Sequence, residues 1–252
     1  MSVVYYLVLI STLQVLAVPE SRTAASCKCG VAKTGSSRIV GGTTAQPNEF
    51  PWMAGMKLFV DGMESVGHGC GGTLINDQWI LTAAHCIFKG EQMDKLFEPK
   101  EVSWVLGEVD TMMEGEKSKI PRIMVKSEKI IPSPEWDKWT TKGDIALVKL
   151  AQKVDLKTYT PACLAKTGDN FDGKKALVYG WGQLAWDNYD PPSLLQKLEV
   201  TVTARQTVVD WAKKVGNFWQ WTLEPGMLCV YTGEGKDACR VSWISTFLKY
   251  FL

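Results

Sequence analysis

Thr82-Ala83-Ala84-His85-Cys86 is the stretch on which the interpretation of this chain depends, because it holds one of the only two histidines. Upstream stands Cys70-Gly71-Gly72-Thr73-Leu74-Ile75, and downstream stands Gly143-Asp144-Ile145-Ala146-Leu147. An unperturbed imidazole has a pKa of about 6.5, so a histidine suits general-base chemistry near neutral pH. A structural histidine is the alternative, and the two flanking motifs argue against it. We therefore predict that His85 is a catalytic base.

Two further motifs complete an ordered set. Arg38-Ile39-Val40-Gly41-Gly42 lies near the start, and Gly235-Lys236-Asp237-Ala238-Cys239-Arg240 lies near the end. Together with the histidine and aspartate motifs, they resemble the trypsin-like serine proteases of the chymotrypsin family. The resemblance covers roughly residues 27–240. It implies that the protein is a secreted endopeptidase made as a zymogen, with a polypeptide substrate or a protease inhibitor and an activating protease as partners.

The resemblance also implies a role for each matching residue. Asp144 would accept a hydrogen bond from His85 and hold its tautomer. The bond between Arg38 and Ile39 would be cut on activation. Asp237 would lie at the base of the specificity pocket and select Arg or Lys before the scissile bond, although a plain loop aspartate is the alternative. No cofactor is expected, and two histidines without nearby paired ligands predict no metal site.

The segment after Arg240 departs from the family pattern. Family members continue with Gly-Asp-Ser-Gly-Gly, which carries the nucleophile, whereas this chain continues with Val241-Ser242-Trp243-Ile244-Ser245. Ser242 is a poor nucleophile candidate, because no glycine precedes it and Trp243 follows it. We expect the chain as given to be inactive, a truncated copy or pseudoenzyme whose residues 241–252 are translated intron or the tail of a real isoform. The alternative function is a non-catalytic homologue that binds a protease or an inhibitor.

The chain has seven cysteines, and an odd number leaves at least one thiol unpaired. The resemblance implies a disulfide between Cys70 and Cys86 around the histidine. It implies a second disulfide from Cys163 to the propeptide, with Cys29 or Cys27 as the partner, and the spacing does not choose between these two. Cys229 and Cys239 are left without an expected partner.

Short β-type runs separated by Gly, Pro, Asn and Asp predict an all-β sandwich or barrel. The expected strands are residues 53–60, 72–75, 79–82, 102–106, 120–131, 145–150, 175–179, 197–203 and 227–230, with a short helix over 204–215. The resemblance sharpens this to a chymotrypsin-like pair of antiparallel β-barrels, of which the first is complete and the second incomplete. The expected segments are a signal peptide over 1–18, a propeptide over 19–38, a protease domain over 39–240 and a non-family tail over 241–252.

Composition limits the classes of partner. A net charge of +1 gives no sign of binding to nucleic acid or to an anionic membrane surface. The apolar run over residues 3–10 is interrupted by Ser11, Thr12 and Gln14. It is therefore short of the roughly 20 apolar residues that a membrane span needs, and a secretory signal peptide is favoured over an anchor. Secretion places the cysteines in an oxidising compartment.

Overall fold

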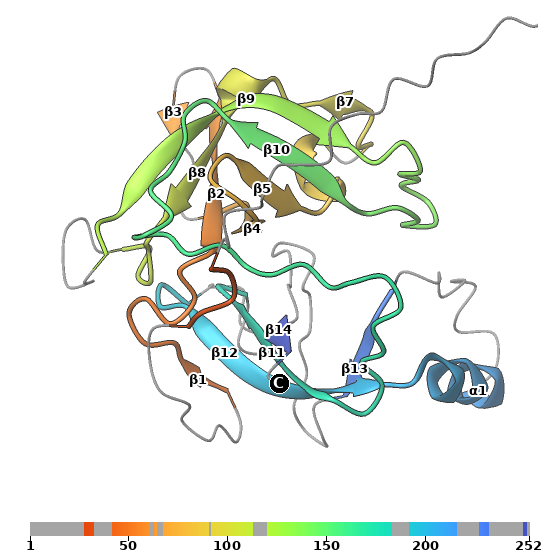
Figure 1. Ribbon diagram of the computed structural model, residues 1–252. Helices are drawn as coiled ribbons and strands as arrows, with labels where there is room; N and C mark the ends of the chain where they lie inside the picture. The colour runs from red at the N-terminus through yellow and green to blue at the C-terminus, as the bar shows by residue number, and fades with distance from the viewer. Residues whose placement is uncertain are drawn as a thin grey trace, which may run out of the picture.

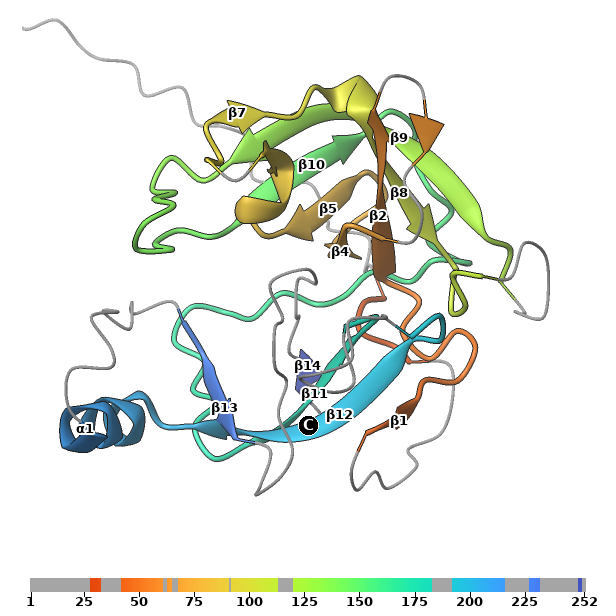
Figure 2. The same ribbon diagram turned by 180° about the vertical axis from the view of Figure 1, so that it is seen from behind.

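The computed structural model describes residues 28–32, 42–60, 63–64, 68–90, 92–112, 120–182, 192–215, 227–231 and 249–250. The expected signal peptide and most of the expected propeptide and tail lie outside these residues. Within them, strands dominate, and Figures 1 and 2 show two β-structures, one above the other. None of the described helices is long and apolar enough to cross a membrane.

The first structure is a closed barrel of six antiparallel strands. Their order is β2-β4-β5-β10-β9-β8, and a direct pairing of β2 with β8 closes the ring. The short strand β3 (Met63–Glu64) extends β2 outside the ring. The predicted first barrel is thus confirmed, with strands β2 (Met53–Val60), β4 (Cys70–Leu74), β5 (Trp79–Thr82), β8 (Val102–Leu106), β9 (Ile123–Pro132) and β10 (Ala146–Leu150).

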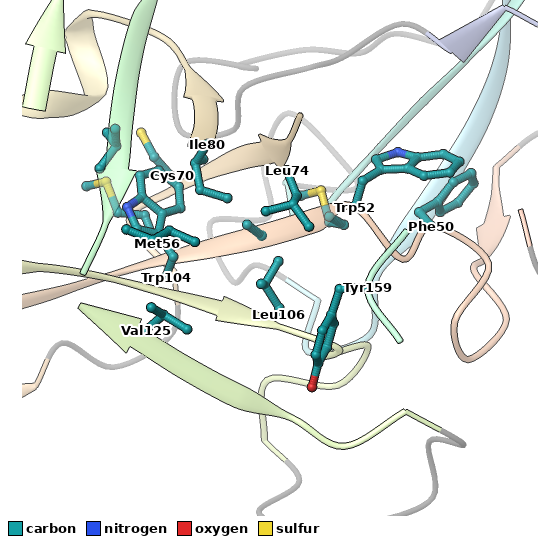
Figure 3. Close-up of a cluster of buried hydrophobic side chains, with 14 of the residues drawn as sticks. Phe50, Trp52, Met56, Cys70, Leu74, Ile80, Trp104, Leu106, Val125 and Tyr159 are labelled. Carbon is teal, nitrogen blue, oxygen red and sulfur yellow. The ribbon is translucent and has the colours of Figure 1, made fainter. Parts of the chain in front are cut away.

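Side chains fill the barrel interior, as strand alternation requires. Every second residue of β10 is buried, and all five residues of β8 are buried. Gly72 is needed at its place, because an added Cβ would lie 2.5 Å from Ile80 Cγ2 and 2.6 Å from Trp104 Cζ3. Figure 3 shows Trp104, Ile80 and Met56 gathered in this core, with Phe50 and Trp52 at its other end.

The second structure is a five-stranded antiparallel sheet. Strand β12 lies at its centre and pairs with β11 on one side and with β1 and β13 on the other, and β11 also pairs with β14. Among the described residues, no pairing closes this sheet into a ring. Its strands are β1 (Thr43–Thr44), β11 (Lys175–Gly180), β12 (Gln196–Thr203), β13 (Cys229–Tyr231) and β14 (Lys249–Tyr250).

Helix α1 (Arg205–Val215) follows β12 and stands out from the end of the sheet (Figure 1). It matches the predicted helix over 204–215. The region 89–100 precedes β8 and contains short regular elements. It holds the hairpin of β6 (Phe88–Lys89) with β7 (Lys95–Leu96) and the 3-10 helix η2 (Pro99–Glu101).

Aromatic side chains join the barrel to the second sheet. Trp52 Nε1 donates a hydrogen bond to the Tyr179 hydroxyl at 2.7 Å, and the ring of Phe50 stacks on Tyr179 with centroids 4.0 Å apart. Burial raises the pKa of Tyr179 far above its usual range. The backbone also links the two structures, because Leu195 N donates to Val109 O at 2.7 Å. These contacts fix the position of one half against the other.

Candidate active site

His85 follows the barrel strand β5 by three residues, in a short turn that buried neighbours hold in place. Strand β5 ends at Thr82, whose hydroxyl donates to Gly71 O at 2.8 Å. Ala84 is fully buried, and the chain then turns through the 3-10 helix η1 (His85–Ile87). Because Ala84 and Ile87 are both buried on the inside, the turn leaves the His85 side chain partly exposed, at 22%.

Asp144 reaches His85 from the loop just before β10, the strand that pairs with β5 in the barrel. Its Oδ1 accepts from the backbone N–H of His85 at 2.8 Å, and its Oδ2 lies 2.7 Å from His85 Nδ1. Gly143 makes this approach possible, because its φ is +65° and a Cβ there would lie 2.8 Å from the carbonyl carbon of Glu135. A carboxylate that accepts from Nδ1–H keeps the lone pair of a neutral imidazole on Nε2, where it can act as a base.

The disulfide between Cys70 and Cys86 ties β4 to the turn that carries His85. Its Cα atoms are 6.0 Å apart, and the closed loop stabilises the fold by about 3 kcal/mol in the chain-entropy model. Cys70, Cys86 and His85 bring potential metal-ligand atoms within 4.8 Å of one another. Because the two sulfurs are bonded to each other, they offer no thiolate, and this group is unsuited to a metal ion.

A second disulfide joins Cys29 to Cys163 across 134 residues of sequence. The sequence left Cys27 and Cys29 as alternatives, and the structure selects Cys29. Gly30 holds this segment against the strand of chain that carries Cys163. Its φ is +66°, and its N–H donates to Pro161 O at 2.8 Å. Cys229 is free and half-buried, and its pKa is raised by burial, which Arg205 only partly offsets.

The loop between β9 and β10, at the end of which Asp144 lies, was not singled out by sequence reasoning beyond that residue. Its Asp137 accepts from the backbone N–H groups of Thr140 and Trp139, and these bonds lower the pKa of the Asp137 carboxyl. Thr141 adopts a φ of +57°, which is uncommon for a β-branched residue. Such backbone conformations gather at functional sites.

A buried polar cluster around Glu108 was also missed by sequence reasoning. His68 Nε2 bonds to Glu108 Oε2, and Arg122 Nε donates to Glu108 Oε1 at 2.7 Å. Burial raises the pKa of Glu108, but the bonds and charges of His68 and Arg122 outweigh it, and the net pKa is lowered. The His68 ring also packs on Trp181, with centroids 4.7 Å apart. Only its tertiary neighbours reveal this arrangement.

The structure brings His85 and Asp144 together and forms both expected disulfides. Arg38, Ile39 and Asp237 lie outside the described residues, as do Ser242, Cys27 and Cys239.

Comparison with known proteins places these features in a family. A family model described as "Trypsin" matches residues 39–241. The chain is 31% identical over 222 residues, 86% of its length, to serine proteinase stubble of Drosophila melanogaster. It is 32% identical over 231 residues, 88% of its length, to venom serine protease 34 of Apis mellifera. The matches cover 27% and 51% of these relatives, so the chain spans only part of their length.

Proposed function

The chain belongs to the trypsin family of serine proteases, and from this premise we propose that it is built as a secreted endopeptidase zymogen. The observation that carries the proposal is the pairing of His85 with Asp144. One carboxylate accepts from both the backbone and the imidazole of the same residue, at 2.8 and 2.7 Å. Such double anchorage fixes the ring orientation that a general base needs.

In this proposal each residue has one task. If the family's nucleophile were present, His85 Nε2 would take the proton of its hydroxyl, and Asp144 would stabilise the imidazolium that forms. Cleavage between Arg38 and Ile39 would activate the zymogen, and Asp237 would select substrates with Arg or Lys. The partners are a polypeptide substrate or a protease inhibitor and an activating protease. The apolar run over residues 3–10 supports secretion.

We further propose that a chain with this sequence does not hydrolyse peptide bonds. Val241-Ser242-Trp243 follows Arg240 where the family has Gly-Asp-Ser-Gly-Gly. That motif supplies the nucleophile and the amides of the oxyanion hole, and the loss of one donor alone costs about 10²–10³ in turnover. It also supplies the carboxylate that pairs with the new ammonium of Ile39. A buried charge without its partner costs about 3–5 kcal/mol, so cleavage would not order the site.

The test is a fluorogenic amide substrate with arginine before the scissile bond, given to the pure protein cut at Arg38. We expect no turnover above that of a His85→Ala variant. Turnover that a serine-directed inhibitor blocks, and that His85→Ala abolishes, would contradict the proposed inactivity. Sequencing of the transcript across the codon for Arg240 shows which sequence follows in the main message. If the main message encodes Gly-Asp-Ser-Gly-Gly after Arg240, its product is an active protease.

A non-catalytic homologue that binds a protease or an inhibitor is the second candidate. The pairing of His85 with Asp144, together with the change from the family's nucleophile motif to Val241-Ser242-Trp243 in the sequence, favours it. A folded protease domain can still bind a polypeptide when it cannot cleave one. It predicts a secreted, folded protein of this length that forms a stable complex with a polypeptide without cleaving it. Size-exclusion chromatography of mixtures with a Kunitz-type inhibitor or with trypsin tests this candidate.

A further inference from the structure

The disulfide between Cys70 and Cys86 lies against the imidazole of His85. Cys86 Sγ is 3.5 Å from His85 Nε2, the ring nitrogen opposite the one that faces Asp144. Cys70 Sγ is also close, because the sulfur atoms of both cysteines and a ring nitrogen of His85 lie within 4.8 Å of one another. A disulfide that only crosslinks two segments needs no ionisable neighbour. This contact therefore indicates a chemical property of the bond that the crosslink does not require.

The imidazole is held in the orientation that makes this contact. Asp144 Oδ2 lies 2.7 Å from Nδ1 of the ring, and Asp144 Oδ1 accepts from the backbone N–H of His85 at 2.8 Å. Cys86 follows His85 directly in the 3-10 helix η1, so the two side chains stay neighbours when the disulfide is open. A base that contacts a sulfur and is oriented by a third group is the arrangement that activates cysteine nucleophiles.

The contact makes the two sulfurs of the bond unequal. A histidine beside a cysteine stabilises the thiolate when the ring is protonated, and a thiol with a stabilised thiolate is the better leaving group in thiol–disulfide exchange. His85 Nε2 contacts Cys86 Sγ, so Cys86 is the sulfur that leaves more readily when an external thiol attacks the bond. The attack is then directed to Cys70 Sγ, which forms the new sulfur–sulfur bond.

We propose that the Cys70–Cys86 bond is an exchange site for small thiols, which attack Cys70 Sγ and release Cys86 Sγ as a thiolate beside the protonated His85 ring. A bond forms between the thiol sulfur and Cys70 Sγ, and the bond between the two cysteines breaks. Its electron pair stays on Cys86 Sγ, and the proton that the thiol gives up goes to His85 Nε2. The thiol is oxidised to a mixed disulfide, and Cys86 is reduced. No serine takes part, so the proposal is independent of the proposed peptidase function.

Access to this bond is narrow, which determines the reagent and the reference for a test. Cys70 and Cys86 are each 5% exposed, whereas the other disulfide joins a partly exposed Cys29 to an exposed Cys163. Access alone predicts that Cys29–Cys163 is reduced first, and that removal of the His85 ring opens Cys70–Cys86 to faster attack. Stabilisation of the Cys86 thiolate by His85 predicts the opposite, because reduction slows when the ring is removed.

The first test uses the intact protein and 2-mercaptoethanol, a small thiol, near neutral pH. Iodoacetamide traps the thiols that form, and peptide mass spectrometry gives the reduction rate of each disulfide in the same chain. We expect the Cys70–Cys86 bond to be reduced at least about 10-fold more slowly in His85→Ala than in the wild-type protein. Cys29–Cys163 is the internal reference, and its rate is the same in both proteins. At early times, the mixed disulfide is on Cys70 and the trapped thiol is on Cys86.

A matched pair of variants tests the two sulfurs separately. Cys70→Ser leaves the Cys86 thiol, and Cys86→Ser leaves the Cys70 thiol. The free and half-buried Cys229 is the reference thiol in each chain. Relative to it, we expect iodoacetamide to modify Cys86 about 10-fold faster than Cys70, and we expect His85→Ala to abolish the difference.

Circular dichroism shows which of these variants fold, and the test on the intact protein stands without them. Three results there overturn the proposal: a Cys70–Cys86 bond that stays closed in the folded wild-type protein, equal or faster reduction in His85→Ala, and a mixed disulfide on Cys86. Equal alkylation of the two thiols in folded variants overturns it as well.

Discussion

Removal of the Glu49 carboxylate should destabilise the protein strongly, because it leaves a buried ammonium without its partner. Lys197 Nζ lies 2.7 Å from Glu49 Oε1 and 2.8 Å from Oε2, and the two side chains are only 2% and 8% exposed. Glu49 Oε2 also accepts from Gln46 N at 2.9 Å. The pair joins the segment before β2 to the centre of the second sheet, and solvent screens it little.

The magnitude follows from what remains after the change. In Glu49→Gln the two carboxylate contacts to Lys197 are lost, and an uncompensated buried charge costs about 3–5 kcal/mol. The whole fold is stable by only about 5–15 kcal/mol, so the loss is a large part of the total. Replacement of both residues removes the charge as well as its partner. The double variant Glu49→Leu with Lys197→Met should therefore recover most of the lost stability.

Urea denaturation followed by tryptophan fluorescence measures these differences as free energies of unfolding. An exposed pair on the same sheet supplies the control, because Lys175 of β11 and Glu199 of β12 are 71% and 36% exposed. Glu199→Gln should cost no more than about 1 kcal/mol. The reasoning fails if Glu49→Gln costs no more than Glu199→Gln, or if the double variant is less stable than Glu49→Gln alone.

Three more substitutions have defined outcomes. Gly72→Ala should lower the free energy of unfolding in urea by about 1–3 kcal/mol, because the added methyl group overlaps the barrel core. Gly69→Ala is the control and should cost much less, because the nearest atom to its added methyl group would be 3.5 Å away. Equal costs would contradict the packing argument. Serine at both Cys70 and Cys86 should cost about 3 kcal/mol by the same assay, and a loss near zero would contradict the loop-entropy account. The bonds and charges of His68 and Arg122 outweigh burial and hold the pKa of Glu108 below its ordinary value of 4.5. The stability that this group contributes is therefore present above that pH and is lost as the pH falls through the lowered pKa. Glu108→Gln should therefore flatten the loss of stability as the pH falls below about 5, and an unchanged pH profile would refute this assignment.

Local sequence patterns were enough to predict the barrel strands and the two candidate site residues. Alternating apolar residues located the barrel strands, because a buried face repeats every second residue along a strand. The observed ends differ by a few residues, as at β9, where the strand begins at Ile123 and residue 120 was expected. His85 and Asp144 were found because each sits in a distinctive run of neighbours. A motif of this kind is a short-range property, and the sequence displays it directly.

Contacts between distant segments were decided only by the folded chain. Cys29 and Cys27 are equivalent in sequence spacing, and the bend at Gly30 is what brings Cys29 to Cys163. The burial of Lys197 with Glu49 spans 148 residues, and nothing in either local sequence indicates it. The hydrogen bond from Lys138 Nζ to Gln92 O depends in the same way on how two loops meet. Sequence by itself determined which residues could do chemistry, whereas tertiary packing decided their partners, because partner choice depends on distances in space and burial from water.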